Sequence, residues 1–180
     1  MLNFSAVASD IGVSVPTVKR WLSVLEASFL IYLLPPYYQN FGKRIIKAPK
    51  LYFTDVGLLT YLLNLKEENI LINGPMAGAV FETMIISEIW KRKSASGIIP
   101  ELYYWRSQNG VEIDLLLPCK GTVIPCEIKL SSALKPAFYK NILYFLTLSG
   151  NQHGEGRLYT NCAAPMPLPE NIKNIFWQEI

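Results

Sequence analysis

The stretch VEIDLLLPCKGTVIPCEIKL, residues 111–130, decides the fold because it predicts a β-hairpin. Two runs rich in apolar and β-branched residues flank Lys120-Gly121, a dipeptide suited to a two-residue turn. With the turn at this position, Asp114 faces Glu127 across the two strands. Since side chains alternate along a strand, four charged residues project from one face: Glu112, Asp114, Glu127 and Lys129.

The two opposed carboxylates indicate a cation between them. Directly opposed Cβ atoms lie roughly 5 Å apart, so Asp114 and Glu127 repel each other unless a proton or a divalent cation intervenes. Hard oxygen ligands of this kind suit Mg²⁺ or Mn²⁺. A simpler interpretation stays open, because amphipathic hairpins often carry charges on their solvated face and Glu112 opposite Lys129 would be an ordinary cross-strand pair.

Glu82 favours the metal site. Residues 78–93 predict a helix with an apolar stripe, and Glu82 lies near the middle of that stripe. A carboxylate buried there costs several kcal/mol unless it is protonated, paired or bound to a cation. A structural contact with a backbone amide or with Arg106 is the alternative. We therefore predict a site of three carboxylates with Mg²⁺ or Mn²⁺ as cofactor: Glu82, Asp114 and Glu127.

The order of the predicted elements resembles the αβββαβ core of the PD-(D/E)XK, or restriction-endonuclease-like, superfamily. These elements are the helix with Glu82, strands at 102–106, 111–117 and 123–130, a helix at 136–148 and a strand at 156–161. The superfamily takes an Asp from its second strand and Glu-x-Lys from its third, and Asp114 and Glu127-Ile128-Lys129 match those positions. Ile113 stands where the motif has Pro. The resemblance implies a mixed central sheet and a catalytic set: Asp114, Glu127, Lys129 and Glu82.

A closer resemblance is to the C-terminal region of prokaryotic AAA-type ATPases that end in a domain of unknown function. It runs from about residue 3 to residue 160, and these phrases carry it: 50–58 (KLYFTDVGL), 81–82 (FE), 104–106 (YWR), 110–114 (GVEID) and 127–129 (EIK). That family carries an ATPase module upstream, whereas this sequence has no Gly-x-x-x-x-Gly-Lys-Ser/Thr phosphate loop. An ATPase module is therefore an expected partner, in cis or in trans, and ATP hydrolysis is not expected of these residues.

The N-terminal third predicts a winged helix-turn-helix. Asn3 caps a first helix, and Ser14 caps a second that runs to about Ala27. Strands at 29–34 and 51–54 follow, joined by a basic connection. Winged helices bind DNA or connect proteins, so both kinds of partner stay open. The predicted nucleic-acid contacts lie on the second helix and the connection: Thr17, Lys19, Arg20, Lys43, Arg44 and Lys47.

The predicted fold class is α+β or α/β, with the winged helix-turn-helix followed by the restriction-endonuclease-like core. Residues 1–66 hold seven basic residues against three acidic ones. One of the basic residues, Lys50, lies on or near the predicted wing. The polar stretch 67–75, punctuated by Gly and Pro, marks a boundary. We predict a winged-helix domain at 1–66, a nuclease-like domain at 75–162 and a Pro-rich extension at 163–180.

Composition points to a cytoplasmic protein with no membrane partner. The 180-residue chain is 51% hydrophobic, yet its apolar runs fall short of the roughly 20 residues that a membrane span needs. Neither end predicts a signal peptide. The three cysteines form no C-x-x-C pair, which is typical of a reducing compartment.

Two functions are consistent with these patterns. The first is a Mg²⁺-dependent endo- or exonuclease acting on DNA. In it Asp114 and Glu127 bind the metal, Glu82 is a direct or water-mediated ligand, and Lys129 steadies the attacking hydroxide or the oxyanion. The second is a non-catalytic module that binds DNA or a protein partner through the winged helix, since a fold alone does not confer an activity.

Overall fold

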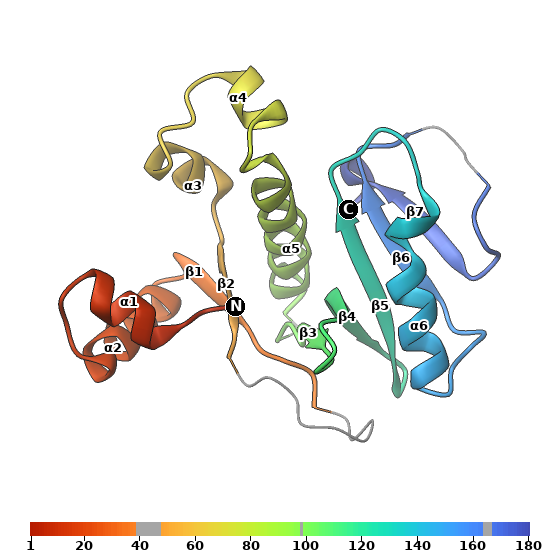
Figure 1. The fold of residues 1–180 in the computed structure, drawn as a ribbon, viewed down its shortest axis with the longest axis horizontal. Coiled ribbons are helices and arrows are strands. Elements are labelled where there is room, and N and C mark those ends of the chain that lie inside the picture. Colours follow the sequence, from red (N-terminus) through yellow and green to blue (C-terminus); the bar gives the residue numbers. More distant parts are fainter. Residues whose placement is uncertain (39–47, 98, 164–166) are drawn as a thin grey trace.

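The computed structural model describes residues 1–38, 48–97, 99–163 and 167–180. Within these ranges the fold is mixed α+β, with six α-helices, a two-stranded antiparallel sheet and a five-stranded mixed sheet (Figure 1). The helix α5 (Ala77–Ala95) lies between the two sheets and packs against both. None of the helices in the described ranges is long and apolar enough to span a membrane.

Two short helices open the chain, α1 (Phe4–Asp10) and α2 (Val15–Ala27). Asn3 caps α1 by accepting hydrogen bonds from two backbone amides, and Ser14 caps α2 in the same way through one amide. Gly12 turns the chain between them with a left-handed backbone, φ 70°. These caps and this turn confirm the predicted pair of helices.

The small sheet pairs β1 (Ile31–Leu34) with β2 (Lys50–Phe53) in antiparallel register. Residues 39–47, which hold the predicted basic connection, lie outside the described residues. After β2, the Asp55 side chain caps α3 (Val56–Leu62) by accepting a hydrogen bond from a backbone amide of its first turn. The two predicted strands are therefore confirmed.

The sequence did not predict one helix, α4 (Glu68–Asn73), which lies in the stretch 67–75 that we interpreted as a polar boundary. Its apolar run, residues 70–72, gives the segment hydrophobic surface, and α4 packs against α5. Glu68 in the first turn also complements the positive end of the helix dipole. The polar residues of this stretch therefore led us to predict a boundary where a short helix forms.

The large sheet has the strand order β3-β4-β5-β6-β7. In chain order these strands are β3 (Tyr103–Arg106), β4 (Glu112–Cys119), β5 (Thr122–Lys129), β6 (Gly156–Thr160) and β7 (Ile172–Phe176). Strands β3, β4 and β5 are antiparallel neighbours, whereas β5, β6 and β7 run parallel to one another. The predicted hairpin is confirmed, because Cys119 pairs with Thr122 around Lys120-Gly121.

Helices cover both faces of this sheet. On one face α5 buries Ile85 and Ile86 in a core that also contains Leu115 of β4 and residues of the small sheet. On the other face α6 (Lys140–Leu148), which follows a 3₁₀ turn, buries Phe145 against β3 and β4. The two cores hold β4 and β5 rigidly between the helices, so that side chains at the ends of these strands have defined positions.

The sheet continues beyond residue 162, where we placed the end of the nuclease-like domain. Strand β7 adds a fifth strand parallel to β6, followed by a 3₁₀ turn, η2 (Trp177–Glu179). The strand starts after Pro169, since proline cannot donate the hydrogen bonds of a ladder. Ile172, only 4% exposed, anchors it in the core beneath α6.

Candidate functional site

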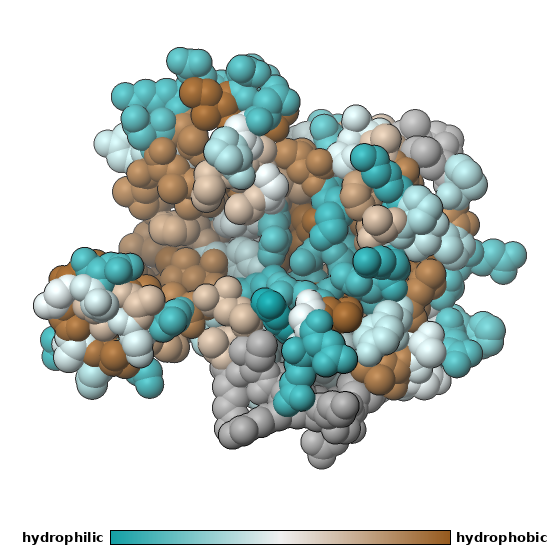
Figure 2. Space-filling model, viewed as in Figure 1, coloured by the Kyte–Doolittle hydropathy of each residue, from teal (hydrophilic) through white to brown (hydrophobic). Residues whose placement is uncertain are grey.

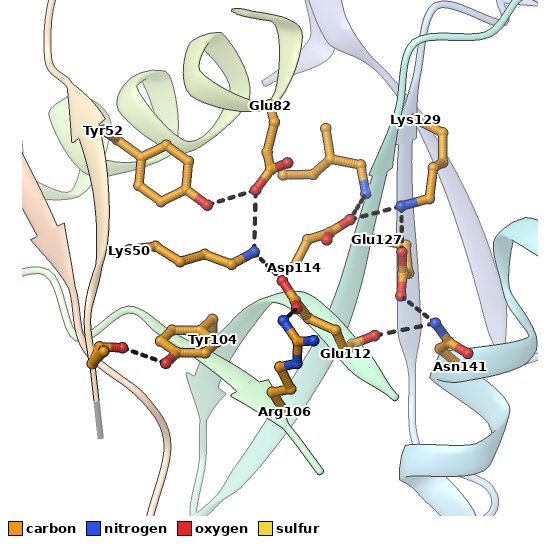
Figure 3. A network of polar contacts seen from close by, with 12 residues as sticks. Lys50, Tyr52, Glu82, Tyr104, Arg106, Glu112, Asp114, Glu127, Lys129 and Asn141 are labelled. Carbon is orange, nitrogen blue, oxygen red and sulfur yellow. Dashed lines mark hydrogen bonds and ion pairs between the residues drawn. The ribbon is translucent and has the colours of Figure 1, made fainter. Parts of the chain in front are cut away.

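Charged side chains from several elements meet where β4 and β5 separate (Figure 3). The last pair of the ladder between these strands is Leu115 with Cys126, and Asp114 and Glu127 are the next residues beyond it. On the other side of β4 the register with β3 shifts, so that one extra residue lies in β4 beside Asp114. Such a bulge interrupts the alternation of side chains and is common next to functional sites. In Figure 2, hydrophilic residues gather on the surface between α5 and the large sheet.

Asp114, Glu127 and Lys129 form the first of two linked clusters. The Lys129 ammonium lies 2.9 Å from Asp114 Oδ2 and 2.5 Å from Glu127 Oε2. The Ile128 amide donates to Asp114 Oδ2 at 2.9 Å, and Asn141 of α6 donates to Glu127 Oε1 at 3.3 Å. Each carboxylate therefore has a neutral donor that fixes its orientation, and both share one positive charge.

The two carboxyls of this cluster have opposite pKa shifts. Burial and then the charge of Asp114 raise the pKa of Glu127 from 4.5 to about 8, and the Glu127 residue is 2% exposed. Burial also raises the pKa of Asp114, but the charges of Lys129 and Lys50 and the Ile128 amide outweigh it, so that this pKa lies below its usual range. The pair therefore binds its first proton on Glu127, as expected for two close carboxylates in a buried site.

Lys50 of β2 organises the second cluster. Its ammonium lies 3.3 Å from Glu82 Oε1 and 2.5 Å from Glu112 Oε1, and it is 5.5 Å from the centroid of the Tyr104 ring. The Tyr52 hydroxyl donates to Glu82 Oε1 at 2.5 Å. Burial lowers the pKa of Lys50, but the charges of the nearby carboxylates outweigh it and hold this pKa above its usual value. Lys50 is therefore charged at neutral pH.

The structure brings together three of the four predicted catalytic residues, since Asp114, Glu127 and Lys129 are in direct contact. Among the described residues, no hydrogen bond or ion pair joins Glu82 to these three, and its carboxylate instead accepts hydrogen bonds from β2. Glu112 was expected opposite Lys129, but its carboxylate pairs with Lys50 and with Arg106 at 3.1 Å. The early end of the β4–β5 ladder and the bulge beside Asp114 account for this difference. Arg106, considered as a partner of Glu82, therefore binds Glu112.

Two carboxylates of the site suit a divalent cation. Within the described residues, no group of three or more His, Cys, Asp or Glu side chains is arranged to hold a metal ion. Asp114 and Glu127, however, contact the same ammonium, so their oxygens already converge on one positive charge. Magnesium is commonly bound by one or two carboxylates together with waters and substrate phosphates. The pair fits that donor set, and Glu82 as a third ligand stays a prediction.

Three residues of the site were not predicted from the sequence: Lys50, Tyr52 and Asn141. We placed Lys50 on or near the wing, but its side chain is only 12% exposed and lies between two carboxylates. One sequence signal was present, because Lys50 and Tyr52 are two residues apart on a strand and share a face. The partner of that face, Glu82, lies on α5, and no local pattern identifies it.

The predicted nucleic-acid contacts on α2 are partly accessible. Lys19 and Arg20 are exposed, and the Lys19 ammonium lies 5.4 Å from the centroid of the Phe4 ring. Thr17 is half-buried, and its hydroxyl hydrogen-bonds the capping Ser14 at 2.8 Å. The other predicted contacts lie outside the described residues: Lys43, Arg44 and Lys47. DNA contact by these six residues stays a prediction.

Comparisons with known proteins divide the chain in two. Residues 1–69 match a family described as Domain of unknown function (DUF8612), and residues 77–179 match one described as Domain of unknown function (DUF4143). The latter family is often found with AAA-type ATPases. Uncharacterized proteins of Mycobacterium bovis and Mycobacterium tuberculosis are each 33% identical over 127 residues, which cover 70% of this chain and 28% of the relative. The chain thus matches little more than a quarter of the length of these relatives. No solved structure matches it.

Proposed function

We propose that this chain, which belongs to the family described as Domain of unknown function (DUF4143), hydrolyses phosphodiester bonds of DNA with Mg²⁺ or Mn²⁺. The observation that carries this proposal is the buried pair of Asp114 and Glu127 with Lys129 between them. The order α5-β3-β4-β5-α6-β6 gives further support, because it fits the αβββαβ core of the PD-(D/E)XK superfamily. In that core the Asp and the Glu-x-Lys occupy the positions that these residues hold.

The electrostatics of the pair favour a metal-bound state. Because burial and Asp114 raise the pKa of Glu127 to about 8, the pair carries less than its full negative charge at neutral pH. A divalent cation would compensate both carboxylates and displace that proton. The proposed ligands are Asp114 and Glu127, with Glu82 reaching the metal directly or through a water. When bound, the metal would supply an activated water and neutralise charge on the phosphate.

The remaining groups of the site have roles that need no rearrangement of the backbone. The Ile128 amide and the Asn141 side chain hold the carboxylates of Asp114 and Glu127 in place. Lys129, whose side chain is 34% exposed, would turn its ammonium toward the reacting phosphate and stabilise the charge that develops there. This residue therefore links the carboxylate pair to the solvent-accessible side of the site.

A second candidate function is a non-catalytic interaction module, and the surface of α2 favours it. Trp21 is 47% exposed and Val24 58% exposed, three residues apart and therefore on one side of the helix. Exposed apolar side chains of this size are typical of protein contacts. The order α1-α2-β1-β2 also fits the proposed winged helix, which would bind DNA through Lys19 and Arg20 or dock on an ATPase module.

A cleavage assay separates these two functions. Supercoiled plasmid and single-stranded DNA are incubated with Mg²⁺ or Mn²⁺ and with the wild type, Asp114→Asn or Lys129→Met, each checked for folding by circular dichroism. We expect each substitution to lower the cleavage rate by about a hundredfold or more. Lys91→Met is the matched control, because Lys91 pairs with Glu88 on the exposed side of α5 and its loss should leave the rate unchanged.

The outcomes have distinct meanings. Cleavage that survives both Asp114→Asn and Lys129→Met excludes this site as its source. An absence of cleavage by the folded wild type on both substrates, with either metal, refutes the nuclease proposal and favours the interaction module.

A further inference from the structure

Lys50 connects the two halves of the chain at the candidate site. It lies on β2, within the part that matches the first family, whereas the proposed ligands lie within residues 77–179. Its ion pair with Glu82 joins residues 32 positions apart, and its side chain is only 12% exposed. The packing of β2 against α5 fixes the position of this ammonium.

Two side chains of β2 contact one carboxylate oxygen that the metal site would need. Glu82 Oε1 accepts hydrogen bonds from Lys50 at 3.3 Å and from the Tyr52 hydroxyl at 2.5 Å (Figure 3). Both donors come from β2 and lie on the same face of it. The same ammonium also pairs with Glu112, which keeps Lys50 between α5 and β4. Glu82 is thereby engaged by the N-terminal half of the chain.

An ammonium and a divalent cation compete for the same oxygen. A carboxylate oxygen that already accepts two hydrogen bonds, a short one from Tyr52 and a longer one from Lys50, has less capacity left for a metal, and the positive charge of Lys50 also repels a second cation. Even at the dielectric constant of water, a unit charge roughly 6 Å from a doubly charged ion changes its binding about tenfold. Repulsion by Lys50 and its contact with Glu82 therefore act in the same direction.

We infer that Lys50 is a positioning residue that holds Glu82 on β2 and thereby lowers the affinity of the Asp114–Glu127 site for divalent metal. The N-terminal half of the chain then controls whether the third carboxylate is available. This inference rests on the proposed metal site, but it concerns regulation by a residue from outside that site. It assigns to Lys50 and Tyr52 of β2 a role in metal loading in addition to their place in the small sheet.

Titration calorimetry with Mn²⁺ tests the inference without any substrate. The variants are Lys50→Met, Glu82→Gln and the double variant, each compared with the wild type at fixed pH and salt. Lys50→Met should bind Mn²⁺ more than tenfold more tightly than the wild type, because it loses the repulsion, worth about tenfold, and also releases Glu82. The gain from Lys50→Met should be smaller when Glu82 is already replaced, because only the repulsion is then lost. Lys50→Arg keeps the charge, and Lys91→Met removes a lysine on the exposed side of α5; both should bind as the wild type does.

Each result of this titration decides between the two proposals. If Asp114→Asn abolishes Mn²⁺ binding but Lys50→Met leaves it unchanged, the metal site stands and the role of Lys50 is wrong. If the gain from Lys50→Met is equally large when Glu82 is also replaced, Lys50 acts through its charge alone and does not position Glu82. Binding by Lys50→Met but not by the wild type supports the inference, whereas no binding by either refutes both proposals.

A second variant covers the case in which Lys50→Met does not fold. Tyr52→Phe removes the other donor to Glu82 Oε1 and keeps the buried ring, so it changes little else. It should tighten Mn²⁺ binding about threefold, the effect of one hydrogen bond. Unchanged or weaker binding by this variant contradicts the inference.

Discussion

Replacing Glu127 with Gln should stabilise the protein at alkaline pH. The Glu127 residue is 2% exposed and shares one ammonium with Asp114, so ionising it places a second negative charge in a buried site. Gln has nearly the same shape as a protonated Glu, and its carbonyl can still accept a hydrogen bond from Lys129, the closer of the two donors to Glu127. The variant should therefore behave like the protonated wild type at every pH.

The pKa shift gives the sign and the size of this effect. The pKa of Glu127 is about 8 in the folded protein against an ordinary value of 4.5, so the folded state binds more protons than the unfolded state between these values. The contribution of this group to stability is complete below pH 4.5 and is lost as the pH rises through 8. At pH 9 the loss is roughly 3 to 5 kcal/mol, and Glu127→Gln should be more stable than the wild type by that amount.

Urea unfolding followed by the fluorescence of the four tryptophans measures this difference. The free energy of unfolding is determined at several pH values between 5 and 9 in EDTA, for the wild type and for Glu127→Gln. Glu155→Gln is the control, because hydrogen bonds from Lys173 and Arg157 hold the pKa of Glu155 below its usual value and the group stays ionised throughout. A wild-type stability that does not fall between pH 6 and 9, or a Gln variant that falls equally, would refute the reasoning.

Three further predictions concern the framework around the site. Asp55→Ala removes the cap of α3 and should lower the free energy of unfolding by about 1 kcal/mol; a urea midpoint equal to that of the wild type would contradict this. Gly156→Ala should cost about 1–3 kcal/mol, because its Cβ would lie 2.3 Å from Ile142 Cγ2, and the same titration tests it. A maleimide should label exposed Cys119 and spare Cys126, whose pKa is raised by burial. Mass spectrometry of the digested protein measures the labelling rate of each cysteine, and similar rates would contradict this prediction.

The hairpin and its register were predictable because their signals are local. Lys120 and Gly121 both have positive φ, 47° and 83°, as a turn between tightly paired strands requires. That turn sets every pair from Cys119 to Leu115, and Asp114 with Glu127 follows one residue later. The closeness of these two carboxylates, which share Lys129, was therefore predictable from the sequence.

The rest of the site depends on packing that a local pattern does not encode. The bulge beside Asp114 appears only when β4 is aligned with β3, and it moves Glu112 away from Lys129 and toward Arg106. The approach of Lys50 to Glu82 depends on where β2 rests on α5. Both features join segments whose separation in sequence carries no periodic signal.

The ion pairs of Lys50 also constrain how these residues can change during evolution. One buried ammonium pairs with Glu82 and Glu112, so loss of Lys50 alone would leave Glu82 without its cationic partner, whereas Glu112 would keep Arg106; the cost should be roughly 1–3 kcal/mol. Evolution should therefore retain or lose these three positions as a set. A recombinant that joins residues 1–69 of one relative to residues 77–179 of another should fold well only when both parents have the same charges at positions 50, 82 and 112.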